Sequence, residues 1–317
     1  MPITVFGAVF VDVKGYPNKK YIPSGRNAGK VLQVHGGVSR NVAEDIANLE
    51  LRPTFVSVVD DSGTSSDVIA KLNRHKVNTK YIRRAAGGLG TWLAIFDNAG
   101  DVVASISQRP DLSEIANILD EHGDEIFASS DSIVEIDMDS DILNRIFALA
   151  DKYGIKVYAV VSNMSIAMER RDLMKRTGCV VCNDQEASIL FSEDYSKYEP
   201  EQLAEIIAKH AKTAQYSNFV VTLGEKGAVY VDEHGNYGHI PAQKTQVIDT
   251  TGAGDGFFTG VAVGLTYGKS LKESCEIGTR VASSVISNSE SVCPRFEPAE
   301  FDLDPAAHRC QQMSIFD

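Results

Sequence analysis

The sequence predicts an α/β fold in which a mostly parallel central sheet is flanked by helices. Short, continuous apolar runs such as residues 155–162 alternate along the chain with stretches such as residues 201–214, whose apolar side chains recur at helical spacing. Strands that are apolar throughout are typical of a parallel sheet buried on both faces. No linker and no internal repeat divides the 317 residues, so we expect a single domain over residues 1–317.

Each predicted element has its own signal within this alternation. The opening residues 3–13 are rich in β-branched residues, and residues 39–51 carry Val42, Ile46 and Leu49 at helical spacing. The remaining strands are predicted at residues 53–60, 129–137, 155–162, 179–183 and 218–224, and the remaining helices at residues 66–77, 141–154, 173–178, 201–214 and 256–268.

Two segments depart from this alternation and predict a second, smaller sheet. Residues 13–35 mix aromatic and β-branched residues with polar ones and have no helical period, and residues 90–107 form a predicted hairpin with its turn at residues 97–100. We expect these segments, about 13–35 and 88–108, to form a small β-sheet beside the main domain. A sheet beside a cleft is placed to act as a lid.

Composition and charge disfavour several classes of function. The formal net charge of −12 and the pI of about 5.1 disfavour nucleic acid or an anionic membrane as a partner. No run approaches the roughly 18 uncharged apolar residues of a membrane span, and the opening segment lacks the basic and small-residue features of a signal peptide. We therefore expect a cytoplasmic protein that binds a small molecule.

The five cysteines are scattered and odd in number, which is typical of a protein from a reducing compartment. Cys179 and Cys182 form a C-x-x-C pair, but no second pair and no nearby histidine completes a zinc site. We interpret them as two small apolar residues on a buried strand.

Residues 249–255, DTTGAGD, carry the strongest chemical signal. Their glycines allow backbone N–H groups to converge, and the helix predicted to follow turns its positive end toward the same point. This predicts an anion site, with Asp255 in the first helical turn placed to take a proton from an attacking hydroxyl. The segment lacks the lysine of a Walker A loop. Taken alone, it is equally consistent with a glycine-rich turn and an aspartate cap.

A Gly-Gly turn leads into the first predicted helix. Gly36 and Gly37 permit close approach of a ligand to the backbone, and Asn41 can both donate to and accept from a sugar hydroxyl. A plain loop-to-helix junction is the alternative explanation of this segment.

Two further segments follow predicted strands. Asn183 and Glu186 open a helix, where an amide and a carboxylate suit hydrated Mg²⁺ and phosphate oxygens. An ordinary helix cap is the alternative. Thr222, Gly224 and Gly227 end another strand, where the phosphates of a nucleotide could lie against the backbone. A β-turn explains them equally well.

In this order, the four segments resemble the PfkB, or ribokinase-like, family of carbohydrate kinases. The resemblance spans nearly the whole chain, from the opening strand with Asp12 through both lid segments, and DTTGAGD is its most specific part. The matching residues are Gly36, Gly37, Asn41, Ala43, Asn183, Glu186, Thr222, Gly224, Gly227 and residues 249–255. The resemblance implies a ribokinase-like, Rossmann-type sandwich with a small β-sheet lid.

The resemblance also implies ATP as the phosphoryl donor, with Mg²⁺. Asp255 would be the general base that deprotonates a primary hydroxyl. The backbone of Gly252, Ala253 and Gly254 would stabilise charge on the transferring phosphoryl group.

The resemblance further assigns the remaining motif residues to substrate, nucleotide and cations. Asp12, Gly36, Gly37 and Asn41 would bind sugar hydroxyls, and Thr222, Gly224 and Gly227 would line the nucleotide. Asn183 and Glu186 would organise phosphates and Mg²⁺, Glu186 through water. Asp249 and Thr251 sit where many members bind a monovalent cation, which makes K⁺ a candidate cofactor.

Within the family, residues 36–49 are most similar to the pseudouridine kinases, which predicts pseudouridine as acceptor and its 5′-hydroxyl as the reacting group. Arg40 is then a candidate substrate-binding residue, with a solvated arginine at a helix start as the alternative. The chain departs from this subgroup at residues 159–162 and at Gln108 and Arg109, near the expected pocket. A free sugar or another nucleoside is therefore an alternative substrate.

A regulator that binds the ligand without turnover is a third hypothesis. The intact Asp255 argues against it, because a sensor needs no general base. Because lids of this kind often pair, a homodimer through the lid is a candidate assembly. Residues 294–305 have a turn-like composition that predicts no role.

Overall fold

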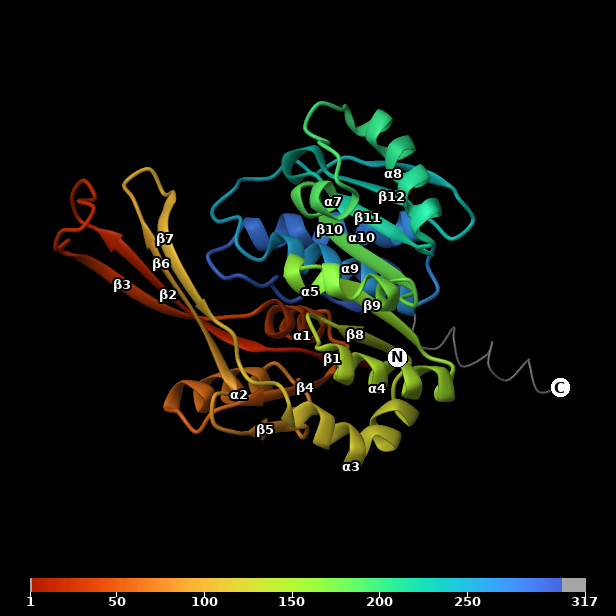
Figure 1. Ribbon diagram of the computed structural model, residues 1–317, viewed down its shortest axis with the longest axis horizontal. Coiled ribbons are helices and arrows are strands. Elements are labelled where there is room, and N and C mark those ends of the chain that lie inside the picture. Colours follow the sequence, from red (N-terminus) through yellow and green to blue (C-terminus); the bar gives the residue numbers. More distant parts are fainter. Residues whose placement is uncertain (1, 304–317) are drawn as a thin grey trace.

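The computed structural model describes residues 2–303, and within them a nine-stranded sheet carries helices on both faces (Figure 1). The strand order is β13-β12-β11-β10-β9-β8-β1-β4-β5. Neighbours from β11 through to β5 pair in parallel, whereas β12 and β13 are antiparallel. The predicted, mostly parallel sheet is confirmed.

The strands and helices have the following bounds. The strands of the main sheet are β1 (Ile3–Phe6), β4 (Thr54–Val59), β5 (Ile82–Arg84), β8 (Ser132–Glu135), β9 (Lys156–Val160), β10 (Cys179–Asn183), β11 (Phe219–Thr222), β12 (Ala228–Val231) and β13 (Tyr237–Ile240). The helices are α1 (Val38–Asn48), α2 (Gly63–Arg74), α3 (Glu114–Ala128), α4 (Ser140–Tyr153), α5 (Met164–Glu169), α6 (Arg171–Met174), α7 (Asp184–Phe191), α8 (Pro200–Ala214), α9 (Ala253–Thr266) and α10 (Leu271–Ile286), with 3-10 turns η1 (Gly224–Lys226) and η2 (Pro298–Phe301).

Alternate residues of the central strands pack into opposite cores. In β1, Val5 belongs to a core shared with α1, α2, α9 and α10, whereas the next residue, Phe6, packs with α3 and α4. In β10, Val181 joins the first core and Cys182 packs under α7 and α8. The period of two along each strand therefore buries both faces of the sheet, as its continuous apolar runs require.

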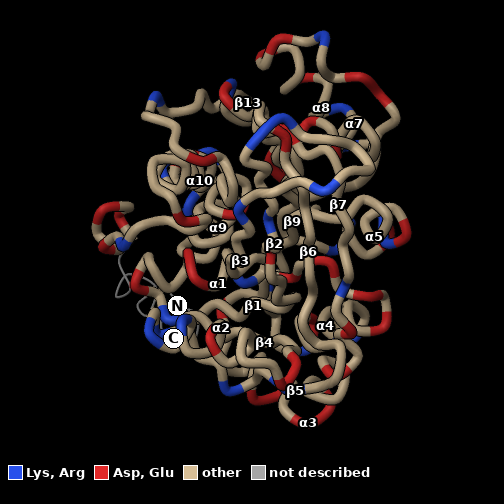
Figure 2. Tube along the Cα trace, turned by 90° about the vertical axis from the view of Figure 1, so that its left-hand side faces the viewer, with Lys and Arg blue, Asp and Glu red and all other residues tan. Residues whose placement is uncertain are grey.

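A second sheet, which we call the small sheet, projects beside the main one (Figures 1 and 2). Its strands are β2 (Val9–Pro17), β3 (Gly29–Gly36), β6 (Leu89–Phe96) and β7 (Val102–Gln108), in the order β3-β2-β6-β7. The hairpin β6–β7 forms as predicted, β2 and β3 pair antiparallel, and β2 joins the two parts by pairing in parallel with β6. The two segments that break the alternation thus form one sheet, as expected.

The small sheet keeps apolar side chains in solvent. Every residue of β7 is exposed, and Val31 and Ile106 are 70% and 71% exposed. Such a surface is unusual for the face of a sheet and is typical of a surface that another body covers. The homodimer through the lid stays a prediction.

Cys179 and Cys182 lie buried on β10, as predicted, and burial raises the pKa of both thiols. Cys275 and Cys293 are also free and buried, while Cys310 lies outside the described residues. Residues 294–303, the described part of the segment with no predicted role, pack onto the main domain, because Phe301 and Leu303 are buried in the core with α9 and α10. Across residues 2–303, no helix has the length and apolar character that crossing a membrane requires.

Candidate active site

The start of α9 is the point at which the predicted site residues converge. Gly252, just before the helix, has a φ of 83°, and a Cβ there would lie 2.1 Å from the carbonyl oxygen of Ser291. Only glycine combines this positive φ with the absence of a Cβ that would clash with the Ser291 carbonyl. The first-turn N–H groups, including those of Gly254 and Asp255, have no acceptor within the helix and lie at its positive end. This end of α9 is therefore suited to an anion.

Neighbouring residues at this helix start line two different cavities. One, of about 510 Å³, is lined by Thr250, Ala253 and Gly254 together with residues of α10, and we call it the α10 cavity. The other, of about 460 Å³, is lined by Thr251, Gly252 and Asp255 together with residues of the small sheet, and we call it the lid cavity. The start of α9 thus lies between the two cavities.

Three elements bring polar side chains into the lid cavity. Asp12 comes from β2, Asn41 from α1 and Asp255 from α9. The amide Nδ2 of Asn41 donates a hydrogen bond to Oδ2 of Asp255 across 2.6 Å. Three of the residues predicted from separate sequence segments therefore share one cavity wall.

The electrostatics of this cavity favour a carboxylate that can exchange a proton. Burial raises the pKa of Asp255 from 3.8 to about 6, against the hydrogen bond from Asn41 and the charge of Arg40. Burial also raises the pKa of Asp12, while the charges of Lys14 and Arg40 oppose the rise. A carboxylate with a pKa of about 6 is mostly ionised at neutral pH and still basic enough to accept a proton.

The Gly-Gly turn shapes the same cavity. Gly37 lines it and has a φ of 94°. Gly36 does not line it, but a Cβ there would lie 2.4 Å from Oδ1 of Asp12. The missing side chain at position 36 therefore makes room for the Asp12 carboxylate.

Arg40 is not a solvated arginine, so that alternative is wrong. Its side chain is 1% exposed and pairs with Glu44 at 2.5 Å. The guanidinium also donates to the carbonyl of His35 at 2.7 Å and to Oδ1 of Asn41. Arg40 stands behind the residues that line the lid cavity, where it fixes the Asn41 amide so that Nδ2 faces Asp255.

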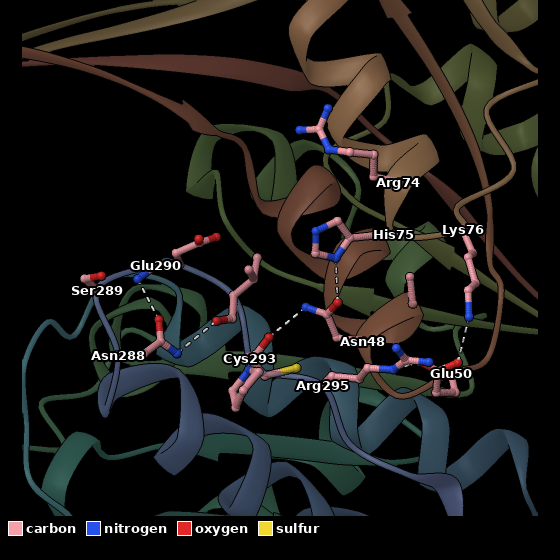
Figure 3. A pocket seen from close by; sticks show the side chains of 13 residues that line it. Asn48, Glu50, Arg74, His75, Lys76, Asn288, Ser289, Glu290, Cys293 and Arg295 are labelled. Carbon is pink, nitrogen blue, oxygen red and sulfur yellow. Dashed lines mark hydrogen bonds and ion pairs between the residues drawn. The ribbon is translucent and has the colours of Figure 1, made fainter.

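The loop after α10 is tied to α1. The N–H of Cys293 donates to Oδ1 of Asp45 at 2.6 Å, and Nδ2 of Asn48 donates to the carbonyl of Cys293 at 2.7 Å. These bonds hold Ser291 against Gly252. A third cavity, of about 490 Å³, is lined by Asn48, His75 and Cys293 among other residues (Figure 3). That cavity contains none of the predicted site residues.

The α10 cavity holds three residues predicted for the nucleotide. Thr222 ends β11, Gly224 opens η1 and Gly227 follows it, and all three line the cavity. Its opposite walls come from residues 242–247 and from α10. The cavity is the size of a typical small-molecule site.

Asn183 and Glu186 form a reciprocal cap at the start of α7. The N–H of Glu186 donates to Oδ1 of Asn183, and Oε2 of Glu186 accepts from the N–H of Asn183, both at 2.8 Å. Neither residue lines the two cavities described above. Residues 2–303 gather no group of three or more metal-ligating side chains. This is the helix cap named above as the alternative, and a role of the two residues in holding Mg²⁺ through water stays a prediction.

Asp249 and Thr251 lie together at the turn before α9. The N–H of Thr251 donates to Oδ1 of Asp249 at 2.8 Å. Burial raises the pKa of Asp249, but hydrogen bonds from Thr251 and the charge of Lys14 outweigh it and bring the pKa below its ordinary value. The lowered pKa favours the ionised carboxylate, and a monovalent cation at Asp249 and Thr251 stays a prediction.

The family model of the pfkB family carbohydrate kinases matches residues 2–294. The chain belongs to this family. It is therefore a kinase of the ribokinase type, a class that transfers phosphoryl groups from ATP to sugars or nucleosides.

Curated relatives differ in their substrates. The chain is 32% identical over 292 residues to the guanosine-inosine kinase of Exiguobacterium acetylicum, covering 91% of this chain and 95% of the relative. It is 24% identical to the pseudouridine kinase of Escherichia coli, with 90% of each chain covered. The ribokinase of Arabidopsis thaliana, solved with ribose and ATP, superposes with a TM-score of 0.81 at 20% identity, over 95% of this chain and 98% of the other. That likeness confirms the ribokinase-like fold.

The lid cavity of this pfkB family member also contains residues that the sequence analysis did not assign. Trp92 and Ser107 come from the small sheet, and Asp137 and Ser162 follow β8 and β9. Arg109, noted only as a departure from the subgroup, lines it as well. A polar residue just after a buried strand was the available signal for Asp137 and Ser162, since ligands bind beyond the carboxyl ends of parallel strands.

Proposed function

We propose that this kinase transfers the γ-phosphoryl group of ATP to a primary hydroxyl of a ribosyl compound, with Asp255 as the general base. One observation carries the proposal. The helix start that bears Asp255 separates two cavities, with Asp255 on the lid cavity and Gly254 on the α10 cavity. An acceptor and a donor bound on either side would meet at the positive end of α9.

The residues of the lid cavity bind the acceptor and take its proton. Asp12 and Asn41 hold sugar hydroxyls, so that the primary hydroxyl faces the Asp255 carboxylate. Asp255 accepts the hydroxyl proton as the oxygen bonds to phosphorus, and the bond from phosphorus to the leaving ADP oxygen breaks. The pKa of about 6 suits this task, because the base is ionised before the reaction and holds the proton afterwards.

Charge on the transferring group is stabilised by the backbone. The backbone of residues 252–254 and the α9 dipole would stabilise this charge at the positive end of the helix, where the N–H of Ala253 also donates to the carbonyl of Thr250 at 3.2 Å. Thr222, Gly224 and Gly227, which line the α10 cavity, would contact the nucleotide. Mg²⁺, held by Glu186 through water, would neutralise phosphate charge, and K⁺ at Asp249 and Thr251 would stabilise the turn before α9.

The sequence favours pseudouridine as the acceptor, which would be phosphorylated at its 5′-hydroxyl. A second candidate, guanosine or inosine, is favoured by the relative that is 32% identical. A free sugar is a further alternative.

A cytoplasmic location stays part of this proposal.

An ADP-release assay with MgATP tests the function. Pseudouridine, uridine, inosine, guanosine, adenosine, ribose and fructose are each supplied with and without K⁺. Turnover of a nucleoside supports the proposal, and turnover of ribose or fructose alone keeps Asp255 as the base but assigns a sugar. Ligand binding without ADP release from any compound would contradict catalysis and support a regulator.

We also propose that a second copy of the chain covers the small sheet. Val31 and Ile106 give this sheet an exposed apolar surface. Sedimentation velocity should show a dimer for the wild type and a monomer for Ile106→Asp; a monomeric wild type contradicts the proposal.

A further inference from the structure

One wall of the lid cavity carries a carboxyl group and a guanidinium group that the proposed phosphoryl transfer does not use. Asp137 lies two residues beyond the end of β8, and Arg109 lies just beyond the end of β7. Both line the lid cavity together with Asp12 and Asp255. The guanidinium Nη2 of Arg109 donates to the backbone carbonyl of Asp137 at 3.2 Å, which joins the two residues.

Asp137 is held in a fixed position. Its φ is 53°, in the left-handed region that few side chains adopt, and the hydroxyl of Ser162 donates to its Oδ2. The N–H of Asn163 also bonds to its carboxylate. A carboxylate accepts about four hydrogen bonds, so Asp137 retains capacity to accept from a ligand. A strained, half-buried acid in a ligand cavity is typical of a functional position.

Arg109 supplies the opposite chemistry. Its side chain is exposed, and the hydrogen bond to Asp137 uses one of the five donors of a guanidinium. The remaining donors can bond a carbonyl oxygen of a bound molecule. Acceptor and donor groups thus stand next to each other on the cavity wall.

Aromatic side chains of the small sheet stand in the same cavity. Trp92 and Phe10 both line it and are both partly exposed there. A flat ring is the kind of ligand surface that stacks on such side chains. A sugar alone offers no such ring, whereas the base of a nucleoside does.

We infer that Asp137 and Arg109 select nucleosides whose base carries a lactam, a ring N–H beside a carbonyl, while Trp92 stacks on the base. The inference rests on the proposed function, which places a ribosyl compound in the lid cavity. Hypoxanthine, guanine and the uracil of pseudouridine share the lactam. Its N–H donates to the Asp137 carboxylate, and its carbonyl accepts from the Arg109 guanidinium.

Adenine has the reverse pattern. A ring nitrogen lone pair would face the Asp137 carboxylate, and an amino group would face the Arg109 guanidinium. A site built to bond a polar group rejects an analogue that leaves its own groups unpaired. Adenosine should therefore bind and react far more weakly than inosine.

The sole tryptophan of the chain, Trp92, makes binding measurable without ATP. Its fluorescence is titrated with inosine, guanosine, pseudouridine, adenosine and ribose, with calorimetry on the same ligands as a second measurement. We expect a lactam nucleoside to bind at least tenfold more tightly than adenosine, which corresponds to about 1.4 kcal/mol. Tighter binding of inosine and guanosine, or of pseudouridine, shows whether the site takes a purine or a pyrimidine base. Equal binding of adenosine, or of ribose, would overturn the inference.

Asp137→Asn is the decisive variant. Asparagine tolerates positive φ, so the backbone is preserved, but its amide can donate to the adenine ring nitrogen. We expect the preference for inosine over adenosine to fall roughly tenfold to a hundredfold. Asp139→Asn, at an exposed aspartate two residues away, is the matched control and should keep it. Arg109→Gln, a change of an exposed side chain, should weaken the binding of lactam nucleosides and so also lower the preference for inosine over adenosine.

The two proposals fail differently. Lactam-selective binding that depends on Asp137, without ADP release, would contradict the kinase proposal and support the recognition. ADP release with unchanged selectivity in Asp137→Asn would support the kinase proposal and overturn the recognition.

Discussion

Asn41 and Asp255 are 214 positions apart in the chain, yet the Asn41 amide donates to the Asp255 carboxylate across 2.6 Å. This bond joins the first helix of the chain to the helix that carries the proposed base. It also stabilises the ionised form of Asp255 against the burial that raises its pKa.

The pH dependence of the reaction should report Asp255. Its pKa is raised to about 6, so the base becomes available as the pH rises through that value. We expect kcat/KM to rise with pH with an apparent pKa of about 6. The same shift has the opposite effect on the free energy of unfolding. The folded state binds the Asp255 proton more tightly than the unfolded state, so this contribution to stability is lost as the pH rises from 3.8 to about 6. A profile that is flat between pH 5 and 7 would count against the assignment.

Replacing Asn41 should move this profile. Asn41→Ala removes the hydrogen bond that lowers the pKa of Asp255, so the apparent pKa of kcat/KM should shift upward. The acceptor should also bind more weakly, because Asn41 lines the lid cavity. A pH series of initial rates measures both effects. A weaker KM with an unmoved pH profile would mean that Asn41 serves the substrate alone.

Gly252 and Gly254 offer a matched pair of variants. Gly252→Ala puts a Cβ 2.1 Å from the Ser291 carbonyl at a φ of 83°, whereas a Cβ at Gly254 meets nothing within 4 Å. We expect Gly252→Ala to lower the free energy of unfolding by at least roughly 1–3 kcal/mol. Gly254→Ala, within α9, should be neutral or stabilising. Denaturant unfolding of both compares them, and equal stability would contradict the described turn.

The buried pair Arg40–Glu44 should be costly to break. Arg40→Met leaves the Glu44 carboxylate buried, with Lys71 at 3.0 Å and the His75 ring at 3.6 Å as its remaining neighbours. We expect a loss of about 3 kcal/mol in the free energy of unfolding. The double variant Arg40→Met, Glu44→Leu should recover much of it, since neither charge is left alone. No recovery would show that the pair acts through other contacts.

The layered fold was predictable because its signals are local. The apolar run of β10 and the helical period of α8 each lie within a few residues, and the hairpin β6–β7 was signalled by its own turn. The sequence analysis missed α3, α5, α10, β5, β12 and β13, and the helix predicted at residues 173–178 overlaps α6 only at residues 173 and 174. Gly123 lies within α3, where glycine lowers the helix propensity, and α10 is rich in Ser, Thr and Gly, which weakens the helical period.

The site was only partly predictable. Gly252 and Asp255 stand in one specific motif, so their neighbourhood followed from the sequence. The burial of Arg40 could not be predicted from the sequence, because its partners His35 and Glu44 surround it only once the turn and α1 have formed. The meeting of Arg109 with Asp137 depends on how the small sheet sits on the main one, which no local pattern encodes.

The most direct test of the central claim is Asp255→Asn. The amide keeps an oxygen that accepts from Asn41 but cannot take a proton from the acceptor. We predict that kcat for ADP release falls by roughly 10²–10⁴-fold or more, while binding of the acceptor, followed by Trp92 fluorescence, stays within about threefold of the wild type. An Asp255→Asn variant that turns over like the wild type would contradict the proposed role of Asp255 as the base.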